Sequence, residues 1–124
     1  MRLLIVDDDA AALYAMTEAI KQSIESIVID QATSAKQAFE RLSEQRYDCV
    51  ICDVLMAEMD GIEFLNMSRE IYPKMAVILM TAGDPSIRDV ALENGAFAFL
   101  RKPLDIGKVI YELGRAAEWT RRER

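Results

Sequence analysis

The sequence predicts an α/β fold built on a single, doubly wound (βα)5 parallel sheet, and three observations lead to this. Five short runs of β-branched or large apolar residues alternate with stretches of helical periodicity. The runs are continuously apolar, which is typical of parallel strands that are buried on both faces. A barrel would need eight such units, and 124 residues are too few for it. Right-handed crossovers then place helices on both faces of an open sheet.

The strands are expected at the five apolar runs. These are LLIV at 3–6, IVI at 27–29, CVIC at 49–52, MAVILM at 75–80 and FAFL at 97–100. Each run has the length of a short strand and is rich in the residue types that strands favour. No linker, repeat or low-complexity tract separates them, so we expect residues 1–124 to form one domain.

The helices between the strands are marked by capping signals and by apolar spacing. Start signals stand at Asp9, at Ser34 with Gln37, near Gly61, and at Asp84 with Pro85. Pro73 and Gly95 mark helix ends. The last helix carries the clearest 3-4-7 stripe, at Ile106, Val109, Ile110, Leu113, Ala116 and Ala117.

Composition excludes several classes of function. The formal charge of −6 argues against a nucleic-acid-binding surface, which would need a basic face. No apolar run approaches the roughly 18 residues of a membrane span. Only four apolar residues precede the first aspartates, too few for the core of a signal peptide, so a cytoplasmic location is expected.

Histidine is absent, and the two cysteines are expected to be structural. Without histidine the chain cannot use Ser-His-Asp or Cys-His catalysis, His-ligated zinc or a phosphohistidine. Cys49 and Cys52 imitate a CxxC motif. On a strand, however, their Cα atoms would lie about 10 Å apart, beyond the roughly 7 Å limit for a disulfide.

Polar residues stand where four of the predicted strands end. Asp7 and Asp8 follow the first strand, Asp53 the third, Thr81 the fourth and Lys102 the fifth. The carboxyl ends of parallel strands share one edge of the sheet, where open α/β folds bind their ligands. Adjacent carboxylates repel unless a positive charge lies among them. We therefore expect an oxygen-rich pocket for a divalent cation, with magnesium as its natural occupant.

These motifs resemble those of the receiver domains of two-component response regulators. The matching segments are IVDDD at 5–9, CDVLMAEMDG at 52–61, MTAG at 80–83 and FLRKP at 99–103. The resemblance covers essentially all 124 residues. It implies a CheY-like, flavodoxin-like strand order of 2-1-3-4-5, with no output domain in this chain.

The resemblance also implies a role for each site residue. Asp53 would be the phosphoacceptor. Mg²⁺ would be held directly by Asp8 and through water by Asp7, with Asp53 and the backbone carbonyl of Leu55 as further ligands. The residues implied to bind phosphoryl oxygens and to switch are Thr81 and Lys102, with Phe99 as the switch aromatic. The domain would then not be an enzyme beyond its own phosphorylation and dephosphorylation.

The partners follow from the same resemblance. A sensor histidine kinase would be the phosphodonor, and acetyl phosphate a slow substitute. The face formed by residues 84–119 would rearrange and signal to a downstream protein or a fused output domain. The protein would be a monomer or a phosphorylation-dependent homodimer, binding neither nucleic acid nor membrane.

Three positions depart from the usual pattern of this family or vary within it. Ala57 stands where proline is common, so a looser loop is expected. Leu55 is expected to screen the phosphoryl group from water on one side, and Gly83 to leave the other side open.

Other readings fit the residues less well. A haloacid-dehalogenase-type enzyme needs a second aspartate where this chain has Leu55. A flavin module would be repelled by DDDAAAL, and no GxxxxGK(S/T) loop is present for a nucleotidase or kinase. The alternative that stays open is a pseudo-receiver, a docking module of the same fold that works without phosphorylation.

Overall fold

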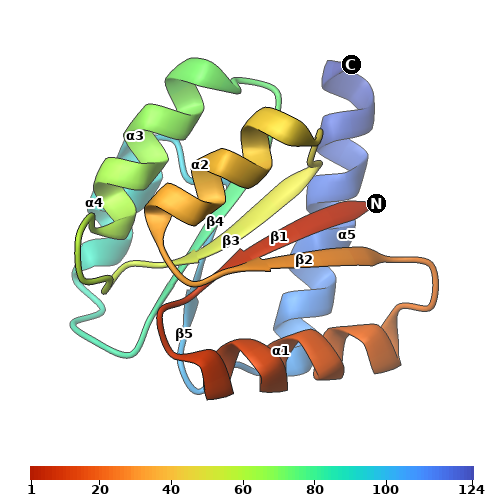
Figure 1. The fold of residues 1–124 in the computed structure, drawn as a ribbon, viewed down its shortest axis with the longest axis horizontal. Coiled ribbons are helices and arrows are strands. Elements are labelled where there is room, and N and C mark those ends of the chain that lie inside the picture. Colours follow the sequence, from red (N-terminus) through yellow and green to blue (C-terminus); the bar gives the residue numbers. More distant parts are fainter.

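The computed structural model describes residues 1–124 as a five-stranded parallel sheet between two layers of helices (Figure 1). The strand order is β2-β1-β3-β4-β5, which confirms the predicted doubly wound fold. The strands are β1 Arg2–Val6, β2 Val28–Ala32, β3 Cys49–Asp53, β4 Ala76–Thr81 and β5 Ala98–Arg101. The helices are α1 Ala10–Ser23, α2 Ala35–Glu44, α3 Gly61–Ile71, α4 Ile87–Glu93 and α5 Ile106–Glu123.

Each face of the sheet carries its own hydrophobic core. Helices α1 and α5 cover one face and helices α2, α3 and α4 the other (Figure 1). Successive residues of a central strand point to opposite faces, so Leu4 packs in one core and Ile5 in the other. Both faces of β3 and β4 are buried along their whole length. This double burial is why the central strands are continuously apolar in the sequence.

Strand β2 differs most from its prediction. The apolar run IVI ends at residue 29, whereas the strand continues through Asp30 and Gln31 to Ala32. It is an edge strand and only half-buried, so polar side chains are tolerated there. The Asp30 carboxylate accepts a hydrogen bond from Arg2 Nη1 at 3.3 Å and another from the Tyr47 hydroxyl.

The starts of α1, α2 and α3 match the sequence signals, whereas the start of α4 does not. The side chain of Asp9 accepts from the amides of Ala11 and Ala12 at the start of α1. Helix α4 begins only at Ile87, later than the predicted start at Asp84 and Pro85. The Asp84 carboxylate instead accepts from the Ser86 amide and closes a turn that precedes the helix. Gly95 ends α4 with a φ of 96°, as expected of a helix-terminating glycine.

Replacing glycine by alanine is expected to have opposite effects on stability at two positions. A Cβ on Gly61, the first residue of α3, would lie 2.7 Å from Val54 Cα and 2.8 Å from the Asp53 carbonyl oxygen. Gly61→Ala is therefore expected to lower the free energy of unfolding by about 3 kcal/mol. A Cβ on Gly114, inside α5, would meet nothing within 4 Å, so Gly114→Ala should raise it by about 0.5–1 kcal/mol. Urea unfolding of both variants checks this, and shifts of the same sign would contradict it.

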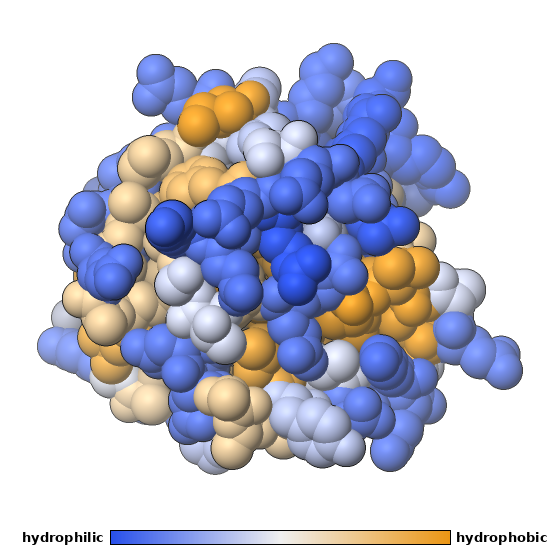
Figure 2. All heavy atoms as spheres, viewed as in Figure 1, coloured by the Kyte–Doolittle hydropathy of each residue, from blue (hydrophilic) through white to orange (hydrophobic).

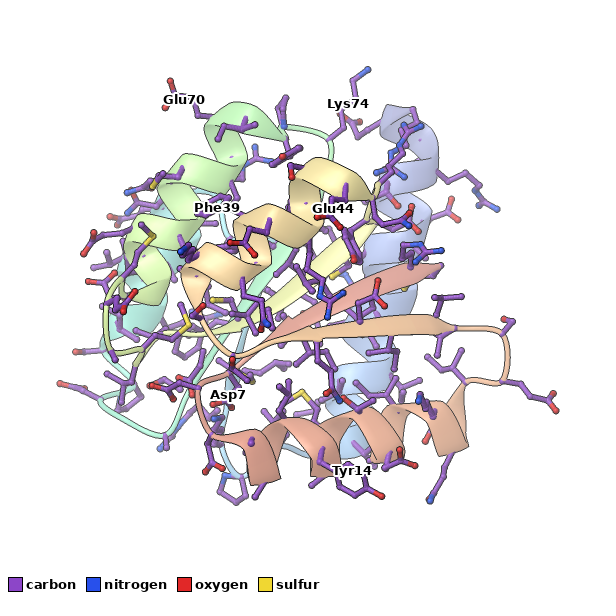
Figure 3. All side chains as sticks on the ribbon, viewed as in Figure 1. Asp7, Tyr14, Phe39, Glu44, Glu70 and Lys74 are labelled. Atoms are coloured by element: carbon purple, nitrogen blue, oxygen red, sulfur yellow. The ribbon has the colours of Figure 1, made fainter.

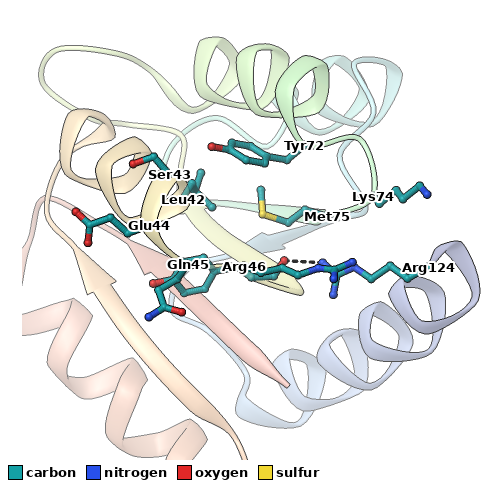
Figure 4. A pocket seen from close by; sticks show the side chains of 10 residues that line it. Leu42, Ser43, Glu44, Gln45, Arg46, Tyr72, Lys74, Met75 and Arg124 are labelled. Atoms are coloured by element: carbon teal, nitrogen blue, oxygen red, sulfur yellow. Dashed lines mark hydrogen bonds between the residues drawn. The ribbon is translucent and has the colours of Figure 1, made fainter.

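A hollow of about 390 Å³ lies at the ends of α2, α3 and α5, and it is lined by Tyr47 and Met75, which precede β3 and β4. Figure 4 shows the side chains around it. Arg124 closes one side of it by donating to the backbone carbonyl of Tyr47 at 2.9 Å (Figure 4). The Asp48 carboxylate accepts from Arg124 and from the Arg2 amide, the latter at 2.7 Å. These bonds attach the end of α5 to the start of β1.

The protein is expected to lose stability at high pH because of the environment of Tyr47. Its ring is buried, and burial together with the hydrogen bond to Asp30 raises its pKa from 10.0 to about 12. The folded state holds the phenol proton more tightly, so this contribution is complete below pH 10 and is lost as the pH rises to 12. Over that interval the wild type should lose about 2 kcal/mol more than Tyr47→Phe. Urea unfolding at several pH values measures this, and equal losses would contradict it.

The two cysteines are unpaired, as their predicted spacing on a strand implies. Cys49 and Cys52 are free and buried, and burial raises the pKa of both thiols well above their ordinary value. No helix is both long enough and apolar enough to cross a membrane. The face in Figure 2 is mostly hydrophilic, with hydrophobic residues in separate small patches.

Candidate functional site

The polar residues that end the strands meet at the carboxyl edge of the sheet. Asp7 directly follows β1, Asp53 ends β3, Thr81 ends β4, and Lys102 directly follows β5. Figure 3 shows Asp7 where β1 turns towards α1. The registers set these ends side by side: Val6 pairs with Cys52, Asp53 with Met80, and Thr81 with Arg101. The parallel topology thus joins residues that lie up to 95 positions apart in the chain.

Lys102 bridges the two buried carboxylates. Its Nζ donates to Asp7 Oδ2 at 2.6 Å and to Asp53 Oδ2 at 2.7 Å. Asp7 is fully buried, and Asp53 is only 6% exposed. Two buried negative charges would repel strongly, and the shared ammonium offsets that repulsion. Lys102 therefore supplies the positive charge that the run of aspartates requires.

Backbone amides hold the other carboxylate oxygens. Asp7 Oδ1 accepts from the Asp9 amide at 2.9 Å, and Asp53 Oδ1 accepts from the Leu55 amide at 3.0 Å. No buried side-chain oxygen or nitrogen in the protein lacks a hydrogen-bond partner. Both carboxylates are thus fixed in orientation before any ligand arrives. The sequence carries no signal for these amides, because every residue except proline has one.

The Lys102 ammonium is held in its charged form. Partial burial by itself lowers the pKa of this lysine, but the hydrogen bonds and charges of Asp53 and Asp7 outweigh that effect. The net result is a pKa raised above the ordinary 10.5. Lys102 is therefore a fixed cation within hydrogen-bonding distance of both acids.

Two of the three predicted carboxylates, Asp7 and Asp53, contact Lys102, and Asp8 does not. Asp8 is exposed, and its side chain makes no hydrogen bond or ion pair. Asp7 directly follows β1 and is buried, whereas Asp8 lies in the bend that leads to α1. No group of three acidic or cysteine side chains lies close enough to hold a metal ion. The donor chemistry nevertheless fits Mg²⁺, because Asp7 and Asp53 are hard oxygen ligands that already surround one cationic group.

Thr81 and its neighbours form the rim of the site. Thr81 is 2% exposed, and its Oγ1 accepts from the Gly83 amide at 2.9 Å. Leu55 is 59% exposed, and its Cδ1 would lie 3.3 Å from a Cβ placed on Gly83. The expectation that Leu55 and Gly83 flank the site on opposite sides is therefore wrong. They lie against each other, so the leucine covers the space that the glycine leaves.

Phe99 lies on β5, which is separated from β3 and Asp53 by strand β4. It is half-buried on β5, where it pairs with Leu79 of β4, two residues before Thr81. Leu79 and Thr81 share a face of β4, and Phe99 packs against the core on the side of α2–α4. Ala57 lies in the irregular loop between β3 and α3, and the Asp60 side chain in that loop caps α3.

The fold and the site together define an α/β domain whose acidic centre lies at the carboxyl edge of a doubly wound sheet. The chain belongs to the response regulator receiver domain family, because the model of that family matches residues 3–113. It is thus a receiver domain of two-component systems, as the sequence motifs predict.

Curated relatives include longer regulators. The chain is 36% identical over 120 residues to the transcriptional regulatory protein ZraR of Klebsiella oxytoca, covering 96% of this chain and 27% of that protein. It is 32% identical over 113 residues to the DNA-binding transcriptional regulator NtrC of Proteus hauseri, covering 90% and 24%. A protein-glutamate methylesterase/protein-glutamine glutaminase of Archaeoglobus fulgidus is 34% identical over 125 residues, covering 95% and 35%. The chain therefore spans about a quarter to a third of these relatives.

Solved structures match over the whole fold. A response regulator receiver domain protein from Clostridium thermocellum superimposes with a TM-score of 0.91 at 25% identity, covering 99% of this chain and 98% of that one. A CheY-like receiver domain protein from Methanospirillum hungatei gives a TM-score of 0.89 at 22% identity with the same coverage, and supports the fold alone.

Proposed function

We propose that this receiver domain accepts a phosphoryl group on Asp53 from a partner histidine kinase, in a reaction that depends on Mg²⁺. One observation carries the proposal. The Asp53 carboxylate is nearly buried, held by the Lys102 ammonium on one oxygen and by the Leu55 amide on the other. A carboxylate fixed in this way can attack a phosphorus atom in line with a good leaving group.

The transfer needs little chemistry from the protein beyond position and charge. An Asp53 oxygen forms a bond to phosphorus, while the bond from phosphorus to the imidazole nitrogen of the donor breaks and its electron pair leaves with the imidazole. Lys102 donates to the phosphoryl oxygens and stabilises their charge. Asp7, Asp8, Asp53 and the Leu55 carbonyl would hold Mg²⁺, which neutralises phosphoryl charge when bound.

The switch is proposed to run from Thr81 to Phe99. Phosphorylation replaces a monoanion by a group near −2 and adds new hydrogen-bond acceptors. The Thr81 hydroxyl accepts a bond from Gly83 but donates none, so its proton is available to a phosphoryl oxygen. Movement of Thr81 towards that oxygen would open space on the face that Leu79 and Phe99 share. The face at residues 84–119 would then rearrange and signal to a downstream protein or an attached output domain.

The proposal is tested by measuring intact mass after incubation with Mg²⁺ and acetyl phosphate. One phosphoryl group should be gained, and EDTA should suppress the gain. If neither acetyl phosphate nor any phosphorylated histidine kinase of the source organism adds mass, the docking-module alternative is favoured instead.

The Leu55 side chain is expected to lengthen the lifetime of the phosphorylated form. Its amide binds Asp53 Oδ1, and its apolar side chain covers Gly83 next to Thr81, so it would limit the approach of water to a phosphoryl group there. Leu55→Asn should accelerate dephosphorylation by roughly two- to tenfold. The decay of the phosphorylated mass after removal of the donor gives this rate. Met67→Asn, at an exposed apolar residue of α3, serves as the control, and a wild-type rate in Leu55→Asn would refute the prediction.

A further inference from the structure

A short segment beside Asp53 is held in place by the side chains of two methionines. Residues 56–59 lie in the loop between β3 and α3, and none of them donates or accepts a hydrogen bond within the protein. Ala57 and Glu58 are exposed, whereas Met56 and Met59 are half-buried and pack against the core on the side of α2–α4. The apolar contacts of two thioether side chains therefore anchor this segment.

Both ends of the segment are attached to Asp53 and the residue after it. On one side the Leu55 amide donates to Asp53 Oδ1 at 3.0 Å. On the other side the Gly61 amide donates to the Val54 carbonyl at 2.8 Å, and Gly61 lies so close to the Asp53 carbonyl that a Cβ would not fit between them. A displacement of residues 56–59 would therefore disturb the contacts that fix Asp53.

The same two methionines are among the few sulfur-containing residues of the chain that are not buried. Cys49 and Cys52 are fully buried, and burial raises the pKa of both thiols, so no reactive thiolate is available to an oxidant. Three of the seven methionines are also buried: Met16, Met75 and Met80. The methionines that reach the surface are Met1, Met56, Met59 and Met67. Two of these four thus lie in one short segment next to the site.

We propose that Met56 and Met59 form a site of reversible oxidation by hydroperoxides, and that their oxidation releases the loop beside Asp53. In each reaction the thioether sulfur attacks one oxygen of hydrogen peroxide, a sulfur–oxygen bond forms and the oxygen–oxygen bond breaks. The transferred oxygen gives its proton to the departing hydroxide, which leaves as water. Sulfur is oxidised by two electrons and the peroxide is reduced. The sulfoxide is polar and loses its preference for the core, and methionine sulfoxide reductases return it to the thioether.

The effect on signalling rests on the proposed phosphorylation of Asp53. The Leu55 carbonyl, which is proposed to hold Mg²⁺, directly precedes Met56 in the chain. Loss of the two anchors would therefore loosen a metal ligand and the amide that orients Asp53 Oδ1. Oxidation of both methionines should slow phosphorylation by acetyl phosphate by roughly three- to tenfold.

The direct test is mild treatment with hydrogen peroxide, followed by peptide mass spectrometry and amide hydrogen exchange. Met56 and Met59 should gain one oxygen atom each, while the buried methionines stay reduced. Exchange should accelerate at the Leu55 and Gly61 amides, which flank the segment, and stay unchanged within β3. A methionine sulfoxide reductase should reverse both changes. None of these readouts requires phosphorylation.

Matched variants separate this site from oxidation elsewhere. Met56→Leu with Met59→Leu keeps an apolar side chain of similar volume without sulfur, so it should be phosphorylated like the wild type and lose the effect of peroxide. Met67→Leu, at an exposed residue outside the loop, is the control and should keep that effect. Met56→Gln with Met59→Gln imitates the polar form and should accelerate exchange at the flanking amides without peroxide.

Three outcomes would overturn the proposal. These are Met56 and Met59 that stay reduced while Met67 is oxidised, oxidation that leaves exchange at Leu55 and Gly61 unchanged, and an equal response to peroxide in the wild type and in the double leucine variant. If the untreated wild type gains no phosphoryl group, the proposed phosphorylation fails by itself. The mass and exchange measurements then still decide whether oxidation releases the loop.

Discussion

Asp53→Asn is expected to abolish phosphorylation while the fold is preserved. The amide cannot act as the nucleophile, so the gain in intact mass with Mg²⁺ and acetyl phosphate should disappear. The variant keeps the bond between Lys102 and Asp7 and removes one of two buried negative charges that share a single cation. Its stability should therefore stay close to that of the wild type. Mass spectrometry and urea unfolding measure the two effects.

The matched control for this substitution is Asp48→Asn. Asp48 precedes β3 whereas Asp53 ends it, so the two carboxylates lie at opposite edges of the sheet. Asp48→Asn should leave phosphorylation unchanged and weaken only the bonds to Arg124 and to the Arg2 amide. A phosphoryl group on Asp53→Asn at the wild-type level would show that another residue is the acceptor.

Lys102→Met is expected to destabilise the fold strongly at neutral pH. Without the ammonium, Asp7 and Asp53 remain as two buried carboxylates with no counterion. Breaking a buried pair in this way costs about 3–5 kcal/mol, and the lower end applies because Lys102 itself is partly exposed. Urea unfolding at pH 7 measures the loss. Phosphorylation should also slow, because the group that stabilises the phosphoryl oxygens is gone.

Two further measurements separate charge from packing in this variant. Adding Mg²⁺ should stabilise Lys102→Met more than the wild type, because the metal would be the only cation left for the two acids. Asp7→Asn in the Lys102→Met background should recover much of the lost stability. If the double variant is as unstable as Lys102→Met, packing of the lysine stem explains the loss instead.

The architecture could be predicted because the central strands are continuously apolar in the sequence. β1, β3 and β4 were located to within about one residue, since a strand covered on both faces must be apolar throughout. The edge strand β5 was located equally well, because its run FAFL is apolar although its last residue, Arg101, is exposed. The prediction failed where burial is incomplete. The edge strand β2 contains Asp30 and Gln31, which an apolar run does not include. The start of α4 was also misplaced, because the signal at Asp84 and Pro85 serves equally for a turn.

The residues that form the site could be predicted from the sequence, but their burial and mutual contacts could not. Parallel topology sends the ends of β1, β3, β4 and β5 to one edge, so Asp7, Asp53, Thr81 and Lys102 could be gathered from their positions alone. Their position after the first strand does not indicate which of Asp7 and Asp8 is buried, and the structure buries Asp7 fully and exposes Asp8. Likewise, no pattern places Leu55 over Gly83, since that contact joins two irregular loops.

The sequence by itself therefore determined the order of the elements, the edge at which the site lies and the residues that could form it. These depend on periodicity and chain direction, which are local properties. Only the tertiary structure decided that Lys102 bridges Asp7 and Asp53, and that backbone amides fix their remaining oxygens. Such contacts depend on side-chain direction and on loops from distant parts of the chain, which become neighbours only when the sheet has formed.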